Sequence, residues 1–417
     1  MNIPHAAKIC LNQDPRAPDF VSDPYALYRQ LHITGVPVFW EDYGFWCLPS
    51  FDSVNGLLRD RRFARLPPVG HERPAMPAHL KDFAAAERHS LLCLEPPEHT
   101  HLRRTVNRAF VGRQVNQMAN AIRAMAHHQL DCMLTHGPCD LLTHYATPIP
   151  VTVITQLLGV PESAGPQLIK WSHDMVRVYT MTQTVQEEHM ANLAAKQFQQ
   201  FLQQVIDEKR GQPGEDLLAQ LLHTEHGEQP LSDHEIISVS ILLLNAGHEA
   251  TVHQLGNAVK TLLKTYPVDN RDALFAMLAD DTQCDALVTE CLRYDAPLHM
   301  FTRYAQEDVT LADGTTIRAG EEVGLLLAAA NRCPDRFTEA DTFNPARADG
   351  GHVSLGAGLH FCVGAQLVKL ELRIALQVLF ERLPDLQLTE EPQYQDAYHF
   401  HGLTSMQVSW DQPGNSP

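Results

Sequence analysis

The longest regular pattern of hydrophobic positions in the chain runs from residue 236 to about residue 263. Ser-Asp-His-Glu at 232–235 precedes it, and a serine followed three residues later by a glutamate is the signature of a helix N-terminal capping box. No residue that breaks a helix, other than lone glycines, appears before Tyr-Pro at 266–267. The pattern therefore predicts one helix of about 50 Å, which would cross the whole protein.

Other patterns set the fold class. Between about 100 and 300 the chain reads as helices joined by short breaks, and Leu367, Leu370, Ile374 and Val378 predict a further helix after Gly364. The segment 308–327 has β-branched residues interrupted by Asp-Gly and Ala-Gly, which predicts a hairpin, and 385–410 is predicted to form strands. These elements indicate a mainly α protein with small β-sheets, of the α+β class.

Composition and charge limit the possible functions. The 417 residues are 44% hydrophobic, an ordinary globular composition. The nine cysteines are irregularly spaced, which indicates a reducing compartment. The N-terminus lacks a signal-peptide pattern and the apolar stretch 236–247 is too short to cross a bilayer, so we expect a cytoplasmic protein with no membrane partner. The net charge of −18 argues against nucleic acid as a partner.

One cysteine lies in a run of glycines just before a predicted helix. The segment SLGAGLHFCVGAQL, residues 354–367, places Cys362 between Gly358 and Gly364. The positive end of a helix favours a thiolate, and glycines leave room for a flat ligand. The same pattern also suits a small buried cysteine or a cysteine nucleophile. A zinc site is disfavoured because the chain has no C-x-x-C pair.

Small residues occupy the middle of the long predicted helix, within NAGHEAT at 245–251. One stripe of the helix has small residues at its middle, with Ala246 at its border. Such a stripe favours close packing against another helix, or else a groove for a flat cofactor and a small gas ligand. The residues of the stripe are Leu243, Gly247, Ala250 and Gln254.

Four separated motifs resemble those of the cytochrome P-450 family, the haem-thiolate monooxygenases, of the soluble bacterial type. LGAGLHFCVG at 355–364 is similar to the family's F-G-x-G-x-H-x-C-x-G signature, and ECLR at 290–293 matches its E-x-x-R. EPPEHTHLRR at 95–104 resembles D-P-P-E-H-T-R-L-R-R, and NAGHEAT resembles the oxygen-binding A-G-x-E-T. The order agrees too, so the resemblance implies a single P-450 domain over residues 1–417.

The resemblance implies haem b, iron protoporphyrin IX, held between the long central helix and the helix of the cysteine loop. Cys362 would be the thiolate ligand of the iron. Glu290, Arg293 and Arg347 would form a buried charge network. The other residues that the resemblance assigns to the cofactor, four of them partners of the haem propionates, are His99, Arg103, Arg303, His360 and Gly364.

The reaction implied is insertion of one atom of O2 into a small organic substrate, while the second atom leaves as water. It uses two protons and two electrons, which we expect from a separate ferredoxin and its reductase because the chain carries no flavin or nucleotide module. The ferredoxin would dock on a basic face near the cysteine, formed by Arg104, Arg108, Arg113, Lys369 and Arg373. The oxygen site would be formed by Ala246, Gly247, Glu249, Ala250 and Thr251.

One departure from the family pattern concerns proton delivery. The family has a threonine after the acid, whereas here Glu249 is followed by Ala250 and then by Thr251. Alanine carries no hydroxyl, and Thr251 is rotated by about 100° around the helix. We therefore expect protons to travel through Glu249 and ordered water, or through a hydroxyl of the substrate itself.

The substrate is predicted only by class, as a mid-sized apolar molecule with oxygen functions. The segments 64–94 and 175–190 are expected to cover it, and the residues expected to line its pocket are Leu243, Leu298, Met300 and Leu403. Two alternatives keep the same haem site. One is a protein that binds or senses a ligand without oxygenating it, and the other is an isomerase or dehydratase that needs no external electrons.

Overall fold

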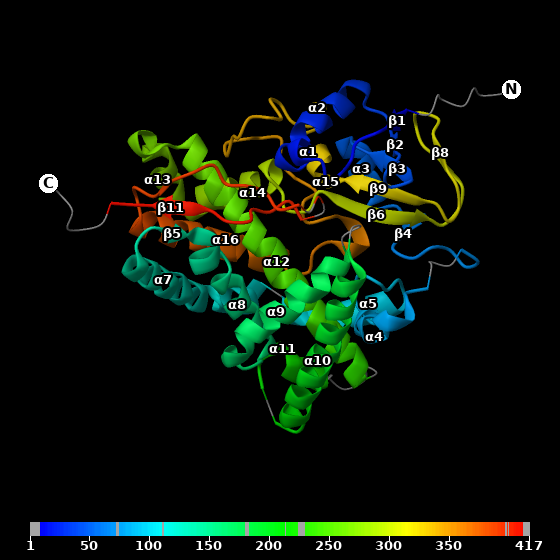
Figure 1. Ribbon diagram of the computed structural model, residues 1–417, viewed down its shortest axis with the longest axis horizontal. Coiled ribbons are helices and arrows are strands. Elements are labelled where there is room, and N and C mark those ends of the chain that lie inside the picture. The colour runs from blue at the N-terminus through cyan, green and yellow to red at the C-terminus, as the bar shows by residue number, and fades with distance from the viewer. Residues whose placement is uncertain are drawn as a thin grey trace.

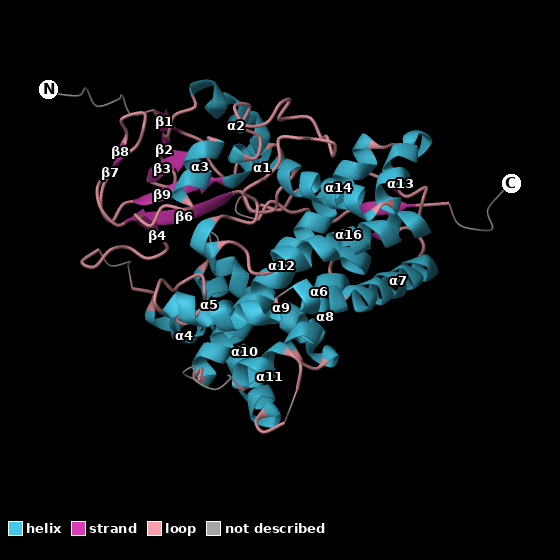
Figure 2. Cartoon of the chain, turned by 180° about the vertical axis from the view of Figure 1, so that it is seen from behind, coloured by secondary structure: helices cyan, strands magenta, loops and turns pink. Residues whose placement is uncertain are grey.

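The computed structural model describes residues 9–71, 75–110, 112–179, 183–212, 214–223, 230–396, 398 and 400–411. Helices fill one side of the molecule, and a sheet lies at the other (Figure 1). The same division is visible from behind (Figure 2). The mainly helical architecture with small sheets confirms the predicted fold class. Among the described residues, no helix is long and apolar enough to cross a membrane.

Helix α12, Asp233–Thr265, is the long helix that the sequence predicts, and it crosses the middle of the molecule (Figure 1). Its capping box is present, because Ser232 Oγ accepts from the Glu235 amide at 3.3 Å and Glu235 Oε2 accepts from the Ser232 amide at 2.8 Å. Helices surround it, so almost its whole length is buried. Its neighbours are α4 (Lys81–Glu87), α8 (Pro148–Leu158), α9 (Gly165–Val176), α10 (Val185–Lys209), α14 (Asp281–Tyr294) and α16 (Ala365–Arg382).

The remaining helices complete the two sides of this arrangement. Those of the first half are α1 (Pro18–Ser22), α2 (Pro24–Thr34), α3 (Phe51–Leu57), α5 (Glu98–Ala109), α6 (Gly112–Gln117) and α7 (Ala119–His136). Those of the second half are α11 (Leu217–Leu222), α13 (Asp272–Ala279) and α15 (Leu327–Ala330). Short 3₁₀ turns that bear on the site are η4 (Arg177–Tyr179) and η6 (Gly358–His360).

The main sheet has the strand order β1-β2-β3-β9-β6-β4. Its strands are β1 (Cys10–Leu11), β2 (Val38–Trp40), β3 (Phe45–Leu48), β9 (Glu322–Leu326), β6 (Met300–Ala305) and β4 (Phe63–Ala64). A second sheet, β10-β11-β5, joins β10 (Gln387–Leu388) and β11 (Gln407–Ser409) to β5 (Cys139–Asp140). The strands expected at 385–410 are therefore confirmed.

The hairpin expected at 308–327 is correct only in its first part. β7 (Val309–Thr310) and β8 (Thr316–Ile317) pair antiparallel around an Asp-Gly turn. β9 instead enters the main sheet, parallel to β3 and antiparallel to β6. Four of the five residues of β9 are buried, so the backbone N–H and C=O groups on both edges of this apolar strand need hydrogen-bond partners. A two-stranded hairpin supplies partners on only one edge.

Candidate active site

The cysteine loop ends where α16 begins, at Ala365. Gly356 and Gly358 have φ of 70° and 68°, left-handed values that favour glycine. A Cβ at Gly358 would clash with the Leu58 carbonyl, so this glycine accommodates the protein's own backbone rather than a ligand. The Cys362 amide donates to the Leu355 carbonyl at 2.9 Å, which folds the loop back on itself and fixes the direction of the thiol.

Burial raises the pKa of the Cys362 thiol, while the Gly364 amide and the charge of Arg103 act in the opposite direction. The helix start alone therefore does not produce the thiolate that the sequence argument expected, because burial outweighs it. A metal cation bound to the sulfur displaces that proton. Arg103, on α5, also donates from Nη2 to the Phe361 carbonyl at 2.6 Å, which holds the loop against α5.

Positive charge accumulates beside the cysteine loop. Arg303, on β6, is 3% exposed, and burial together with Arg65 lowers its pKa to about 9. His99, on α5, is fully buried, and burial together with His360 lowers its pKa to about 4. Both ring nitrogens of His99 lack a hydrogen-bond partner, and its ring centroid lies 4.5 Å from that of His360. Arg303 and His99 therefore have N–H donors that can still bind a hydrogen-bond acceptor.

Glu95 is the carboxylate of this cluster. Its Oε1 accepts from the Arg65 amide at 2.6 Å and lies 3.3 Å from Nε2 of His360. Arg65 also acts on the carboxylate of Glu87. The buried guanidinium of Arg303 and the half-buried guanidinium of Arg103 fit a ligand that carries negative charge, because buried charge needs a partner.

The burial of helix α12 is interrupted at the small residues that the sequence analysis identified. Ala246 is exposed, and Gly247 and Ala250 are partly exposed, although their neighbours along the helix are buried. Ala246 and Ala250 lie one helical turn apart, so this part of the helix surface carries only two methyl groups. A flat ligand could pack closely against it. Gly247 serves packing, since a Cβ there would meet Ile154 of α8 at 3.2 Å.

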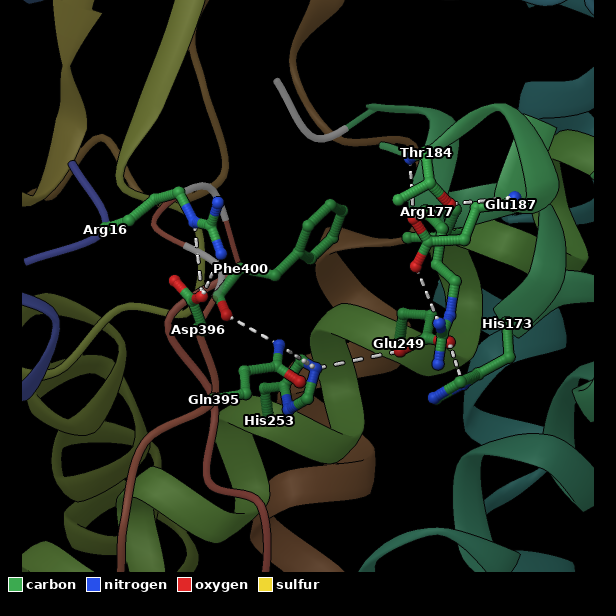
Figure 3. A pocket seen from close by; sticks show the side chains of 11 residues that line it. Arg16, His173, Arg177, Thr184, Glu187, Glu249, His253, Gln395, Asp396 and Phe400 are labelled. Carbon is green, nitrogen blue, oxygen red and sulfur yellow. Dashed lines mark hydrogen bonds and ion pairs between the residues drawn. The ribbon is translucent and has the colours of Figure 1, made fainter. Parts of the chain in front are cut away.

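Glu249 is 6% exposed and lies among three histidines, of which Figure 3 shows His173 and His253. Its Oε1 is 2.8 Å from Nδ1 of His173, on α9, and 3.5 Å from Nε2 of His248, and its Oε2 is 3.7 Å from Nε2 of His253. Burial alone would raise the pKa of this carboxyl, but His173 and His248 outweigh burial and lower it. Glu249 is therefore a buried carboxylate held by imidazoles. Thr251 does not join it, because its Oγ1 donates to the Gly247 carbonyl at 3.1 Å.

A cavity of about 400 Å³ opens beside Glu249 (Figure 3). Its wall includes Val176, Arg177, Thr184 and Glu187, so the expected cover 175–190 contributes to it, although residues 180–182 lie outside the described residues. None of the described residues of 64–94 lines it, and 72–74 are not described. The rest of the wall consists of Arg16, His173, Glu249, His253, Gln395, Asp396 and Phe400.

The residues expected to line the substrate pocket are dispersed. Leu243 and Leu403 are buried in the helical core, and Leu298 forms a β-bridge with Phe400, which lines the cavity. Met300 packs in a different core cluster with Trp40 and Cys47, and neither it nor the three leucines lines the cavity described above. Its surroundings give Met300 a packing role.

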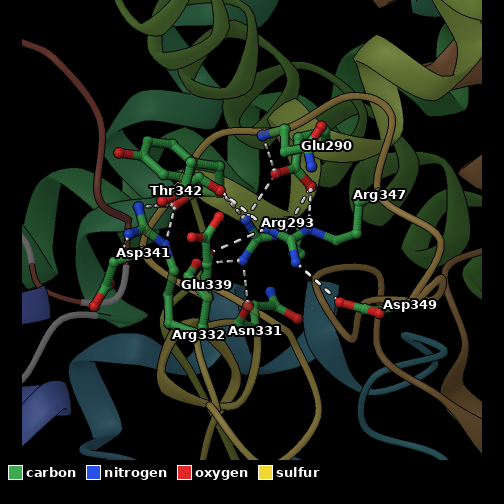
Figure 4. Close-up of polar contacts among 12 residues, drawn as sticks. Glu290, Arg293, Asn331, Arg332, Glu339, Asp341, Thr342, Arg347 and Asp349 are labelled. Carbon is green, nitrogen blue, oxygen red and sulfur yellow. Dashed lines mark hydrogen bonds and ion pairs between the residues drawn. The ribbon is translucent and has the colours of Figure 1, made fainter.

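Glu290, Arg293 and Arg347 lie together (Figure 4). Arg293 binds Glu290 through two hydrogen bonds: Nε donates to Oε2 and Nη2 donates to Oε1, both at 2.7 Å. Nε of Arg347 lies 3.5 Å from Oε2 of Glu290. Nη1 of Arg293 donates to the carbonyls of Asn331 and Ala340, each at 2.8 Å. A charged pair this buried persists because every group has a partner, and it ties α14 to the segment that leads into the cysteine loop.

The profile of the cytochrome P-450 family matches residues 71–407. The chain is 36% identical over 406 residues to the cytochrome P-450 monooxygenase PikC of Streptomyces venezuelae, covering 94% of this chain and 92% of PikC. The chain belongs to the cytochrome P-450 family. It is also 36% identical over 371 residues to the vitamin D(3) 25-hydroxylase of Pseudonocardia autotrophica, covering 87% of each chain. This P-450 is an oxidoreductase of the monooxygenase type.

Solved structures agree with the fold. The P-450 BioI complex with an acyl carrier protein that carries hexadec-9Z-enoic acid has a TM-score of 0.86 and 30% identity, covering 94% of this chain and all of that one. Members of this family bind haem b through a cysteine thiolate. The site fits that group on three observations: the thiol of Cys362, the unpartnered ring nitrogens of His99 beside His360, and the open surface formed by Ala246 and Ala250.

Sequence reasoning missed two residues of the site. His173 contacts Glu249 across 76 positions of the chain, and a lone histidine on an amphipathic helix carries no local signal of such a contact. Arg65 joins the cationic cluster from the loop after β4. Both are found only when distant segments are brought together.

Proposed function

We propose that this P-450 inserts one atom of O2 into a mid-sized organic substrate, using electrons from a separate ferredoxin and its reductase. The buried guanidinium of Arg303 and the half-buried guanidinium of Arg103, together with the Cys362 loop that Arg103 contacts, carry the proposal. A thiol beside a cationic cluster suits an iron-bearing group with acidic side chains, and bound haem supplies the activation of O2.

The chain's own residues then have distinct tasks. Cys362 holds the iron through its sulfur, and the Gly364 amide favours the thiolate. Arg303, His99 and Arg103 bind the propionates, with His360. On α12, Ala246 and Ala250 would leave space for O2, while Gly247 lets the helix pack against Ile154. Glu249 holds a charge near that space and mediates proton transfer, while Thr251 keeps its hydroxyl on the helix backbone.

The substrate belongs to the class of mid-sized apolar molecules with oxygen functions. Val176 and Phe400 supply apolar wall to the cavity beside Glu249, and Gln395 and Arg177 supply polar groups that fix an oxygen function. The relative that acts on vitamin D(3) and the solved neighbour that carries a fatty acyl chain support this size and polarity.

Electrons enter at the face of the cysteine loop. Leu359 and Phe361 are 45% and 42% exposed beside Cys362, and Arg104 is exposed on α5. Apolar side chains within a basic rim suit an acidic ferredoxin. Arg373 contributes less, because it pairs with Asp281 at 3.6 Å and Asp285 at 3.5 Å. The side chain of Arg113 lies outside the described residues.

A spin-state titration followed by turnover tests the proposal. Vitamin D(3) and hexadec-9Z-enoic acid head a chemically varied library, and a compound of the proposed class is expected to shift the haem absorption spectrum. Incubation with NADPH and a surrogate ferredoxin pair should then give a product one oxygen atom heavier. Binding without electron-dependent product would instead support a ligand-binding protein, and product without electrons would support an isomerase or dehydratase.

A further inference from the structure

The three histidines around Glu249 are not equivalent. His253 is buried, and burial lowers its pKa. Its Nε2 lies 3.3 Å from Nε2 of Gln395, whose amide also donates to the Phe400 carbonyl at 2.8 Å. An amide nitrogen only donates, so Nε2 of His253 accepts and the ring is neutral. His253 therefore has no proton to offer at the nitrogen that faces Glu249.

His248 is held by its own helix. Its Nδ1 lies 2.8 Å from the Leu244 carbonyl, which only accepts, so Nδ1 carries a proton and donates it there. The ring is 4% exposed. Its Nε2 lies 3.5 Å from Oε1 of Glu249 without a hydrogen bond to it, and the buried ring has no contact with solvent through which a spent proton could be replaced.

His173 differs from both in its exposure. Its side chain is 59% exposed on α9, and its Nδ1 lies 2.8 Å from Oε1 of Glu249, within reach for proton transfer although the N–H is not aligned for a hydrogen bond in this conformation. Figure 3 shows this ring at the edge of the cavity, on the opposite side of Glu249 from His253. Contact with Glu249 raises the pKa of His173, so the ring is charged over a wider pH range than a free imidazole. Among the described histidines around Glu249, His173 alone joins the carboxylate to water.

We propose that His173 delivers the protons of the reaction to Glu249. The imidazolium turns so that Nδ1–H points at Oε1, and the proton passes to the carboxylate, which leaves a neutral imidazole and a carboxylic acid. The imidazole then takes a new proton from bulk water. The inference rests on the proposed function, in which R–H, O2, two protons and two electrons give R–OH and water. His173 acts through Glu249 and compensates for the missing hydroxyl at Ala250.

Other charges near His173 set the pH range of this transfer. Glu249 raises the pKa of the imidazole most, Arg177 lowers it, and Asp174 raises it on the same helix. Arg177 is itself paired with Glu187 of α10 at 3.0 Å, and Asp174 with Lys170 at 2.7 Å. From α12, His248 and His253 face the carboxylate rather than His173. The rate of proton delivery is therefore highest at low pH, where His173 is protonated, and it falls as pH rises through the raised pKa of His173.

Replacing His173 by arginine separates charge from proton transfer. Arginine keeps the cation beside Glu249 but does not release a proton. With NADPH, a surrogate ferredoxin pair and whichever of vitamin D(3) and hexadec-9Z-enoic acid gives the larger spin-state shift, His173→Arg should form product about 10²-fold more slowly than wild type. The alkaline fall of the wild-type rate should be absent from the pH profile of His173→Arg and of His173→Gln.

Hydrogen peroxide supplies the internal control, because R–H and H2O2 give R–OH and water with no added proton or electron. His173→Arg should therefore keep its peroxide-driven rate within about twofold, and its Tm should match that of wild type because the ion pair persists. His234→Gln, which removes an exposed histidine from the start of α12, should change none of these.

The inference is overturned if His173→Arg keeps the NADPH-driven rate and the alkaline fall, or if it loses the peroxide-driven rate equally. A wild-type protein that forms no product with either oxidant overturns the proposed function itself, and this inference with it.

Discussion

Oγ1 of Thr251 lies 3.1 Å from the carbonyl oxygen of Gly247, one turn back along α12. The hydroxyl thus satisfies its own helix, and Thr251 is 6% exposed. Ala250, by contrast, stands one turn from the exposed Ala246. Any hydroxyl that serves the oxygen site of this P-450 must therefore come from the substrate or from ordered water.

Substrate hydroxyls should control the coupling between NADPH use and product. We expect a natural substrate to couple well, and an analogue that lacks its hydroxyl to bind similarly but to release more hydrogen peroxide per NADPH. Ala250→Thr should raise the product yield of the deficient analogue more than that of the natural substrate, and Glu249→Gln should slow both. If Thr251→Ala alone abolishes coupling, Thr251 is the relay after all.

Cys362→His should change the spectrum of the haem. The reduced carbon monoxide complex of the wild-type protein is expected to show the strongly red-shifted Soret band of thiolate ligation, because the sulfur donates electron density to the iron. The variant should lose that shift. Cys333→Ser, which alters another cysteine of the chain, should keep it, and an unshifted wild-type band would remove Cys362 from the role of ligand.

Arg293→Ala should leave the carboxylate of Glu290 buried without the guanidinium group that binds it. Removing one partner of a buried pair costs about 3–5 kcal/mol, so the variant should yield little folded, haem-loaded protein. Arg373→Ala, which breaks the more exposed pairs with Asp281 and Asp285, should cost less than about 1 kcal/mol. Equal haem loading and equal Tm in the two variants would contradict a structural role for the network.

Ferredoxin docking should depend on the face of α5. Arg104→Glu should raise the ferredoxin concentration needed for half-maximal turnover, and the wild-type rate should fall as salt rises, because screening weakens the attraction between opposite charges. Lys196→Glu, which reverses an exposed charge on α10, is the matched control and should leave the ferredoxin dependence unchanged. Turnover that is independent of salt and unchanged in Arg104→Glu would place the docking site on another face.

His401 should make the protein less stable in acid. Burial lowers its pKa to about 4 from 6.5, so the unfolded chain binds a proton that the folded protein excludes. The stability that this contributes is complete above pH 6.5 and is lost as pH falls through about 4, by up to about 3 kcal/mol. His401→Gln should flatten the loss of Tm over that range, whereas His234→Gln should follow wild type.

Local sequence patterns are enough to predict the long helix α12, its capping box and the helix after Cys362, because periodicity and capping specify helices that have a continuous apolar face. The sequence also placed the cysteine beside glycines and paired Glu290 with Arg293, since those residues are neighbours on one loop or one helical turn. The fold was then predicted from the resemblance of four motifs to those of the cytochrome P-450 family.

Tertiary structure alone decided the partners of the buried charges. Glu249 meets His173 only because α9 packs on α12, and Arg303 of β6 and His99 of α5 both interact with Glu95 only once the chain has folded. Packing likewise placed β9 in the main sheet and Gly247 against Ile154. Each of these contacts joins segments distant in the chain, and no local pattern specifies which buried groups face each other once the elements pack.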